Sequence, residues 1–135
     1  MAGTLIAVDP GKFRSGIAVM LLDGSVLERS VSLTSETADR VAQLCFKYTA
    51  EAVIIGNGGP GKALEKDFAA RNIQASMIFV NEKGSTLEAR GLFWKENRPR
   101  GLMRLLPASL RTPHLPYDDY AAVVIGKRYL KGLSR

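Results

Sequence analysis

The first quarter of the chain decides the fold, and it reads TLIAVDPGKFRSGIAVMLLDGSVLERSVSL over residues 4–33. It contains three runs typical of strands, at Thr4–Asp9, Ser15–Leu22 and Ser25–Leu33, the last two separated by an Asp-Gly pair that favours a hairpin turn. The first two runs are almost continuously apolar, which is typical of strands buried on both faces. The third alternates polar and apolar residues, which predicts a strand at the edge of the sheet.

The rest of the chain alternates between helical and strand-like segments. A helix is predicted to begin at Ser35 as its cap, and Cys45 falls on the apolar stripe of that helix, so it is interpreted as a core residue. Further strands are predicted at Ala52–Gly56 and Ser76–Val80, further helices at Lys62–Arg71, Ser85–Lys95 and Asp118–Leu130, and a long loop at 98–117. This order predicts an α/β fold in a single domain (residues 1–135), with a five-stranded mixed sheet flanked by helices.

The composition excludes several classes of protein. With 46% hydrophobic and 24% charged residues, the chain has enough apolar material for a packed core. No apolar run approaches the roughly 18 residues that a membrane span needs. The only cysteine cannot form an internal disulfide, and the sequence begins without a basic leader, so we expect a cytoplasmic protein with no membrane association.

The positive charge is concentrated at one end of the chain. Residues 1–97 contain 11 basic and 11 acidic residues, so the net charge of +6 lies entirely in residues 98–135. A one-sided basic segment attracts the phosphates of nucleic acid, although a solvated basic tail has the same composition. The residues expected to contact nucleic acid are Lys12, Arg14, Arg98, Arg100, Arg104 and Arg111.

Acidic residues stand at three places where chemistry is expected. Asp9 ends the first strand, Glu82 follows the strand at 76–80, and Asp118 and Asp119 begin the last helix. Each has an ordinary structural explanation taken alone: a turn, a solvent-facing loop acid and a helix cap. Together they form a carboxylate set that suits Mg²⁺ or Mn²⁺, with which a water can hydrolyse a phosphodiester. The set therefore predicts a metal-dependent nuclease.

These motifs, in this order, resemble the YqgF/RuvX family, relatives of the RuvC Holliday-junction resolvases. The matching segments are VDPGK (8–12) with GIAV (16–19), IIGNG (54–58), NEKGSTLEAR (81–90) and DDYAA (118–122). The resemblance implies a ribonuclease-H-like fold and metal ligands at Asp9, Glu82 and Asp118. It also implies a further catalytic carboxylate at Asp119, where the family usually has serine.

The same resemblance carries expectations about function. Family members are linked to maturation of the 5′ end of 16S ribosomal RNA and, by likeness, to junction resolution, so RNA and branched or single-stranded DNA are the expected partners. A homodimer would suit symmetric cutting of a junction. The chain departs from the family pattern at Asn81 and Lys83, where the family has Asp and Arg, and its 98–117 segment is longer and more basic. These departures concern substrate preference.

Two other functions stay open. The segment GNGGPGKA (56–63) follows a strand and nearly spells a phosphate-binding P-loop, which would indicate a nucleotide hydrolase. However, Ala63 lacks the hydroxyl that should hold Mg²⁺, and three strands precede this one. A nucleic-acid-binding module that keeps the fold without cleaving is the second alternative, and Asp9→Asn separates it from a nuclease.

Overall fold

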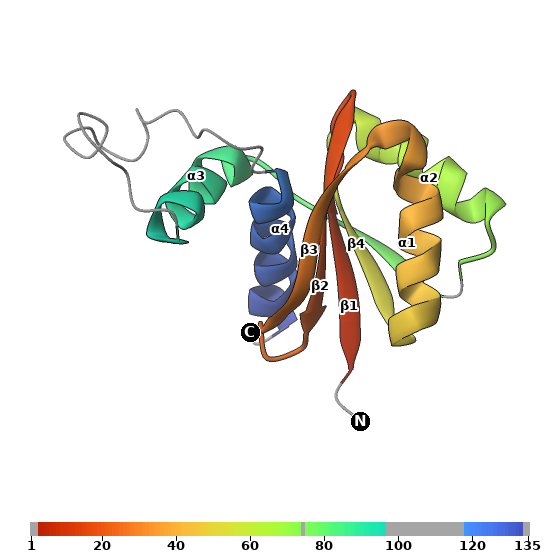
Figure 1. Cartoon of the computed structure of the whole chain (residues 1–135), viewed down its shortest axis with the longest axis horizontal. Helices are drawn as coiled ribbons and strands as arrows, with labels where there is room; N and C mark the ends of the chain where they lie inside the picture. The colour runs from red at the N-terminus through yellow and green to blue at the C-terminus, as the bar shows by residue number, and fades with distance from the viewer. Residues whose placement is uncertain (1–2, 74, 97–117, 134–135) are drawn as a thin grey trace.

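The computed structural model describes residues 3–73, 75–96 and 118–133. The strands and helices are β1 (Thr4–Asp9), β2 (Arg14–Leu21), β3 (Val26–Leu33), α1 (Thr34–Tyr48), β4 (Ala52–Gly56), α2 (Gly59–Ala70), β5 (Ser76–Val80), α3 (Ser85–Glu96) and α4 (Asp118–Leu133) (Figure 1). The predicted loop at 98–117, with four of the expected nucleic-acid contacts, lies outside the described residues. No helix among the described residues is long and apolar enough to span a membrane.

The strands form the predicted five-stranded mixed sheet, in the order β3-β2-β1-β4-β5. Strands β1, β2 and β3 pair antiparallel, whereas β4 pairs parallel with both β1 and β5. The edge position predicted for β3 is therefore confirmed. Because β1, β4 and β5 run in the same direction, their carboxyl ends lie at one end of the sheet.

Both faces of the sheet are covered, as the apolar strands require. Ile6 and Val8 of β1 belong to the core under α1 and α2, and Leu5 and Ala7 belong to the core under α4. Figure 1 shows α1 and α2 on one side of the sheet and α4 on the other. Neighbouring residues of a strand point to opposite faces of the sheet. The odd-numbered residues of β1 therefore face α4, and the even-numbered ones face α1 and α2.

Two helices begin earlier than their sequence predicts. Helix α1 begins at Thr34, whose hydroxyl donates to Gly11 O at 2.8 Å, so the predicted cap at Ser35 is wrong. Helix α2 begins at Gly59 rather than Lys62, and includes Pro60 in its first turn. Proline is accepted there because the first turn of a helix leaves backbone N–H groups without partners in any case. The glycine-proline run reads as a loop in the sequence, and tertiary packing makes it helical.

Cys45 and the β2–β3 edge differ in exposure. Cys45 packs partly buried against the core under α1, and burial raises the pKa of its thiol to about 11, so the predicted packing role is confirmed.

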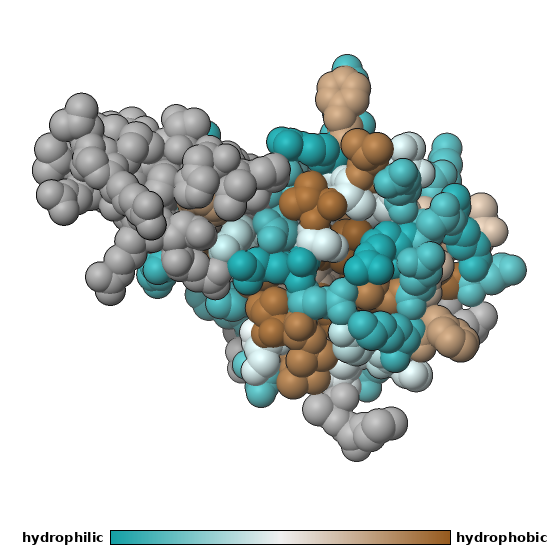
Figure 2. Space-filling model, viewed as in Figure 1, coloured by the Kyte–Doolittle hydropathy of each residue, from teal (hydrophilic) through white to brown (hydrophobic). Residues whose placement is uncertain are grey.

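Around the β2–β3 edge, by contrast, apolar side chains are exposed among polar ones (Figure 2). They are Phe13, Leu22, Val26, Leu27 and Leu33.

Candidate functional site

The sheet brings Asp9 and Glu82 to the same end and the same face. Asp9 is the last residue of β1 and continues the Leu5–Ala7 alternation that faces α4. Val80, the last residue of β5, packs against the same core, and Glu82 follows it by two residues. A Cβ atom at Gly56, the last residue of β4, would meet both Glu82 Oε2 and the side chain of Ile125 in α4. The two carboxylates therefore lie on the α4 side of the edge at which β1 and β5 end.

Glycine at position 16 lets α4 bring Asp118 to this end of the sheet. Gly16 is the strand partner of Asp9. A Cβ atom at Gly16 would lie 1.8 Å from the backbone oxygen of Asp118 and 2.8 Å from the backbone nitrogen of Asp119. Any larger residue would push the first turn of α4 away, so the approach of Asp118 to Asp9 depends on this glycine.

The pKa of Asp9 reflects its burial and the negative charges beside it. It is raised from 3.8 to about 7, chiefly by burial and further by the charges of Glu82 and Asp118. A carboxylate in such a place is stabilised by a proton or by a metal cation. Glu82 and Asp118 are thus both close enough to Asp9 to act on it electrostatically.

Glu82 has a backbone partner from another part of the chain. Its carboxylate accepts a hydrogen bond from the backbone N–H of Gly58, and this bond opposes the effect of burial, which raises the pKa of Glu82. Gly58 lies in the segment that nearly spells a P-loop. In a P-loop such amides point at phosphate, whereas here this amide points at Glu82.

Asp118 carries an oxygen that lacks a full partner. Its Oδ2 atom is buried and finds no hydrogen bond within the described part of the chain. The guanidinium of Arg14 pairs with it only at an Nε–Oδ2 distance of 3.7 Å, which is too long for a hydrogen bond. A buried carboxylate oxygen in this state is costly, and a cation beside it would lower that cost.

Asp119 lies beside a different residue. Its Oδ2 atom accepts a hydrogen bond from Arg29 Nε at 3.1 Å. Arg29 also donates to the hydroxyl of Tyr120 at 2.8 Å and lies over its ring, 4.2 Å from the centroid. These contacts attach the start of α4 to β3. The role of Asp119 as a further catalytic carboxylate stays a prediction.

The carboxylates do not form a ready-made metal centre. No group of three acidic, histidine or cysteine side chains among the described residues is arranged to hold one ion. Glu82 and Asp118 instead face Gly58 and Arg14. The donor set still fits a hard divalent cation, because it consists of carboxylates, one of them with an unsatisfied buried oxygen and another with a pKa near 7. Binding would require the side chain of Asp118 to turn from Arg14 toward Asp9.

Comparison with solved structures identifies the fold. RuvC of Thermus thermophilus in complex with a Holliday-junction substrate matches with a TM-score of 0.58 and 13% identity, over 98% of this chain and 96% of that chain. The large terminase nuclease of the thermophilic phage G20c, with bound cobalt, matches with a TM-score of 0.57 and 18% identity, over 92% and 79%. The chain has the ribonuclease-H-like fold.

At the level of sequence, no family of known proteins and no curated protein matches the chain. The resemblance to the YqgF/RuvX family therefore stays a prediction. The fold itself confirms the predicted class, a mixed sheet covered by helices on both faces.

In this ribonuclease-H-like fold, two predicted nucleic-acid contacts lie near the carboxylates. Lys12 is exposed in the turn after Asp9, with its Nζ atom 5.3 Å from the centroid of the Phe13 ring. Arg14 begins β2, and its side chain is 54% exposed although it pairs with Asp118. It can therefore face both the carboxylates and an incoming phosphate. Arg98, Arg100, Arg104 and Arg111 lie outside the described residues.

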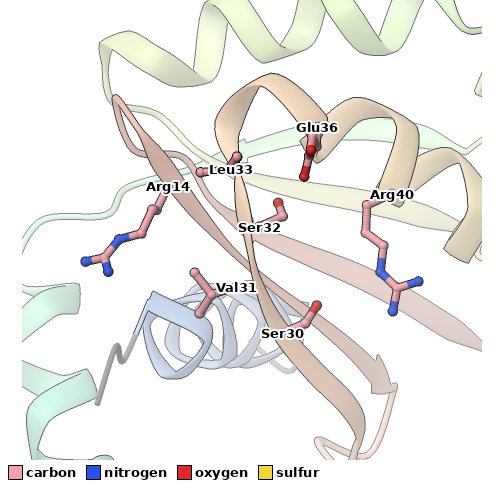
Figure 3. Close-up of a pocket in the computed structure, with 7 residues that line it drawn as sticks. All are labelled: Arg14, Ser30, Val31, Ser32, Leu33, Glu36 and Arg40. Atoms are coloured by element: carbon pink, nitrogen blue, oxygen red, sulfur yellow. The ribbon is translucent and has the colours of Figure 1, made fainter. Parts of the chain in front are cut away.

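A hollow of about 420 Å³ lies around β3, next to Arg14. Its lining residues are Arg14, Ser30, Val31, Ser32, Leu33, Glu36 and Arg40 (Figure 3). The side chains of Arg14 and Arg40 point to opposite sides of β3 in this view. The guanidinium of Arg40 pairs with Glu28 at 3.2 Å. The carboxylates Asp9, Glu82 and Asp118 do not line this hollow, so it is separate from the candidate metal ligands.

Sequence reasoning missed the residues that make the site geometrically possible. Gly16 and Gly58 carry no reactive group, and their importance appears only where a distant residue contacts them. One signal was present for Gly16, because a glycine inside an otherwise apolar strand often marks a close approach of another backbone. For Gly58, the similarity to a P-loop suggested that its amide binds a phosphate, whereas in the structure the amide binds the carboxylate of Glu82.

Proposed function

We propose that the chain is a divalent-metal-dependent nuclease that hydrolyses phosphodiester bonds in nucleic acid. The observation that carries the proposal is that Asp9, Glu82 and Asp118 lie at one end of the sheet, where Asp118 Oδ2 is buried without a hydrogen-bond partner among the described residues. In that place burial, together with the charges of Glu82 and Asp118, raises the pKa of Asp9. Structural similarity to RuvC and to a terminase nuclease supports the same activity, although the low identities establish the fold alone.

Asp9, Glu82 and Asp118 would hold Mg²⁺ or Mn²⁺, with Asp9 at the centre of the set because both other charges act on it. Such an ion, when bound, polarises a phosphodiester and lowers the pKa of a bound water. The chain's own contribution is to gather the carboxylates and to bury Asp9 so that a cation is favoured there. Arg14, half-exposed beside Asp118, would contact a substrate phosphate.

We propose nucleic acid of structured or single-stranded form as the substrate. The resemblance to the YqgF/RuvX family favours the 5′ end of a 16S ribosomal RNA precursor or a four-way DNA junction. The net charge of +6, carried by residues 98–135, supports binding to either polyanion. A homodimer would be favoured if the junction is the substrate, because its two strands are cut symmetrically.

The test is cleavage of labelled RNA with a 16S precursor end, single-stranded DNA, duplex DNA and a four-way junction. Each is incubated with Mn²⁺, Mg²⁺ or a chelator, with wild type and Asp9→Asn. The matched control is Asp67→Asn, an exposed aspartate of α2 on the opposite side of the sheet. Metal-dependent cleavage that Asp9→Asn abolishes and Asp67→Asn retains supports the proposal. Tight binding without cleavage of any substrate would contradict it and would indicate a binding module.

A further inference from the structure

The structure assigns a positioning role to the glycine turn, residues 56–61: its backbone binds the carboxylate of Glu82 and holds it beside Asp9. The inference rests on the proposed function in one respect, since it treats Glu82 as a metal ligand. It concerns glycines, which carry no side chain that could serve as a metal ligand. The turn is therefore a positioning element, and two of its glycines, Gly56 and Gly58, are required by the space that Glu82 occupies.

Two glycines of the turn enclose the Glu82 carboxylate. The N–H of Gly58 donates a hydrogen bond to it. A Cβ atom at Gly58 would lie 1.9 Å from Glu82 Oε1, and a Cβ atom at Gly56 would lie 2.4 Å from Glu82 Oε2. Both distances are far below van der Waals contact, so the carboxylate fills the space in which these two residues would otherwise carry side chains.

The same turn also contacts the residue that follows Asp9. A Cβ atom at Gly56 would lie 3.2 Å from Pro10 Cδ, and one at Gly61 would lie 3.4 Å from Pro10 Cγ. Gly61 further packs against the turn itself, because its Cβ would lie 2.5 Å from Gly56 O. The turn thus lies between the end of β1 and the end of β5, and fixes the position of Glu82 relative to Asp9.

Electrostatics favour the same arrangement. Gly58 is the N-cap residue of α2, and a glycine offers no side chain to bond the free amides of the first turn. The first turn of α2 also lacks an acidic residue. Glu82 supplies the missing negative charge from a distant part of the sequence, at the positive end of the helix dipole. The contact therefore stabilises both the start of α2 and the placement of Glu82.

Gly58→Ala and Gly59→Ala form a matched pair of variants for testing this role. At Gly58 the added methyl group would meet the end of a flexible side chain, so Glu82 is expected to turn away while the fold persists. At Gly59, one residue further, a Cβ would have no atom within 4 Å in the described part of the chain. Both variants add the same group to the same turn, and only one reaches Glu82.

Two measurements are made on the full chain, and neither is an activity assay. Isothermal titration with Mn²⁺ is expected to show affinity lowered about tenfold or more by Gly58→Ala and unchanged, within about twofold, by Gly59→Ala. In the metal-free protein, nuclear magnetic resonance follows the Gly58 amide. Its proton is expected to lie downfield in wild type, to move upfield in Glu82→Ala, and to exchange with solvent about tenfold faster there.

Different results contradict different claims. A Gly58 amide that does not respond to Glu82→Ala overturns the inference, whatever the protein does with metal. Equal Mn²⁺ affinity in wild type and Gly58→Ala overturns the positioning role, even if the amide responds. A wild type that binds no Mn²⁺ overturns the proposed metal-dependent function itself, and the amide measurement then still decides whether the glycine turn binds Glu82.

Discussion

Arg14 Nε lies 3.7 Å from Asp118 Oδ2, a buried oxygen with no hydrogen-bond partner among the described residues. Arg14 begins β2 and Asp118 begins α4, so the pair joins the sheet to the helix at the candidate site. The separation is too long for a hydrogen bond, and the arginine therefore compensates the aspartate only in part. A metal ion bound at Asp118 would replace Arg14 as its positive neighbour and leave the guanidinium free to contact a phosphate.

This relationship predicts opposite effects of Arg14→Ala on two ligands. Binding of nucleic acid should weaken, because one phosphate contact is lost. For the same reason, the slope of log K against log salt concentration should decrease in magnitude by about one. Affinity for Mn²⁺ should stay equal or rise, because a competing cation is removed. The control is Arg71→Ala, which removes an ion pair on the opposite side of the sheet, between Arg71 Nε and Asp39 Oδ1 at 2.7 Å. An unchanged salt dependence would show that Arg14 does not contact phosphate.

The pKa of Asp9 predicts how the stability of the metal-free protein depends on pH. Since folding raises that pKa from 3.8 to about 7, the folded state holds a proton that the unfolded state has released between these values. The contribution of Asp9 to the free energy of unfolding is therefore fully present below about pH 4 and is lost as the pH rises to about 7. The free energy of unfolding falls by about 4 kcal/mol at most over this range. The raised pKa of Glu82 acts in the same direction.

Urea unfolding of wild type and Asp9→Asn across this range measures the effect. The amide side chain introduced by this substitution does not titrate, so the variant should be more stable than wild type at about pH 8, with a smaller difference at about pH 5. Saturating Mg²⁺ should reduce the difference at the higher pH, because the ion stabilises the ionised carboxylate. A stability difference that is the same at both pH values would contradict the raised pKa.

Gly16→Ala is predicted to disturb the start of α4. The new methyl group would lie 1.8 Å from a backbone oxygen, which cannot turn away as a flexible side chain can. We expect a loss of stability of about 2 kcal/mol or more, together with weaker Mn²⁺ binding because Asp118 is displaced. Thermal unfolding alongside Gly59→Ala as the control measures the first effect. Wild-type stability in Gly16→Ala would show that α4 does not approach β2 as closely as described.

Asp119→Ala separates a structural role from a metal-binding one. The variant loses the hydrogen bond that Arg29 donates to Asp119, whereas the hydrogen bond from Arg29 to Tyr120 is kept. The free energy of unfolding should therefore fall by about 1 to 2 kcal/mol. Mn²⁺ affinity should change by less than about twofold, because the carboxylate faces Arg29. A large loss of Mn²⁺ affinity, measured by titration calorimetry, would instead make Asp119 a ligand.

Local pattern was enough to predict the sheet, because the strand runs are apolar and their turns carry clear signals. It also placed Asp9 and Glu82 at strand ends, since parallel strands end together. The start of α2 was not predictable in this way: Gly59 and Pro60 favour a turn in isolation, and it is packing that makes them helical. The contact between Gly58 and Glu82 joins residues far apart in the sequence, and no local pattern encodes it.

The measurement that tests the central claim most directly is the single-turnover cleavage rate of a labelled nucleic acid in Mn²⁺, for wild type and Asp9→Asn. The account predicts that the variant binds the substrate with nearly wild-type affinity and cleaves it about 100-fold more slowly or worse, with no cleavage by either protein in chelator. Cleavage by Asp9→Asn at the wild-type rate, or cleavage by wild type in chelator, would contradict it.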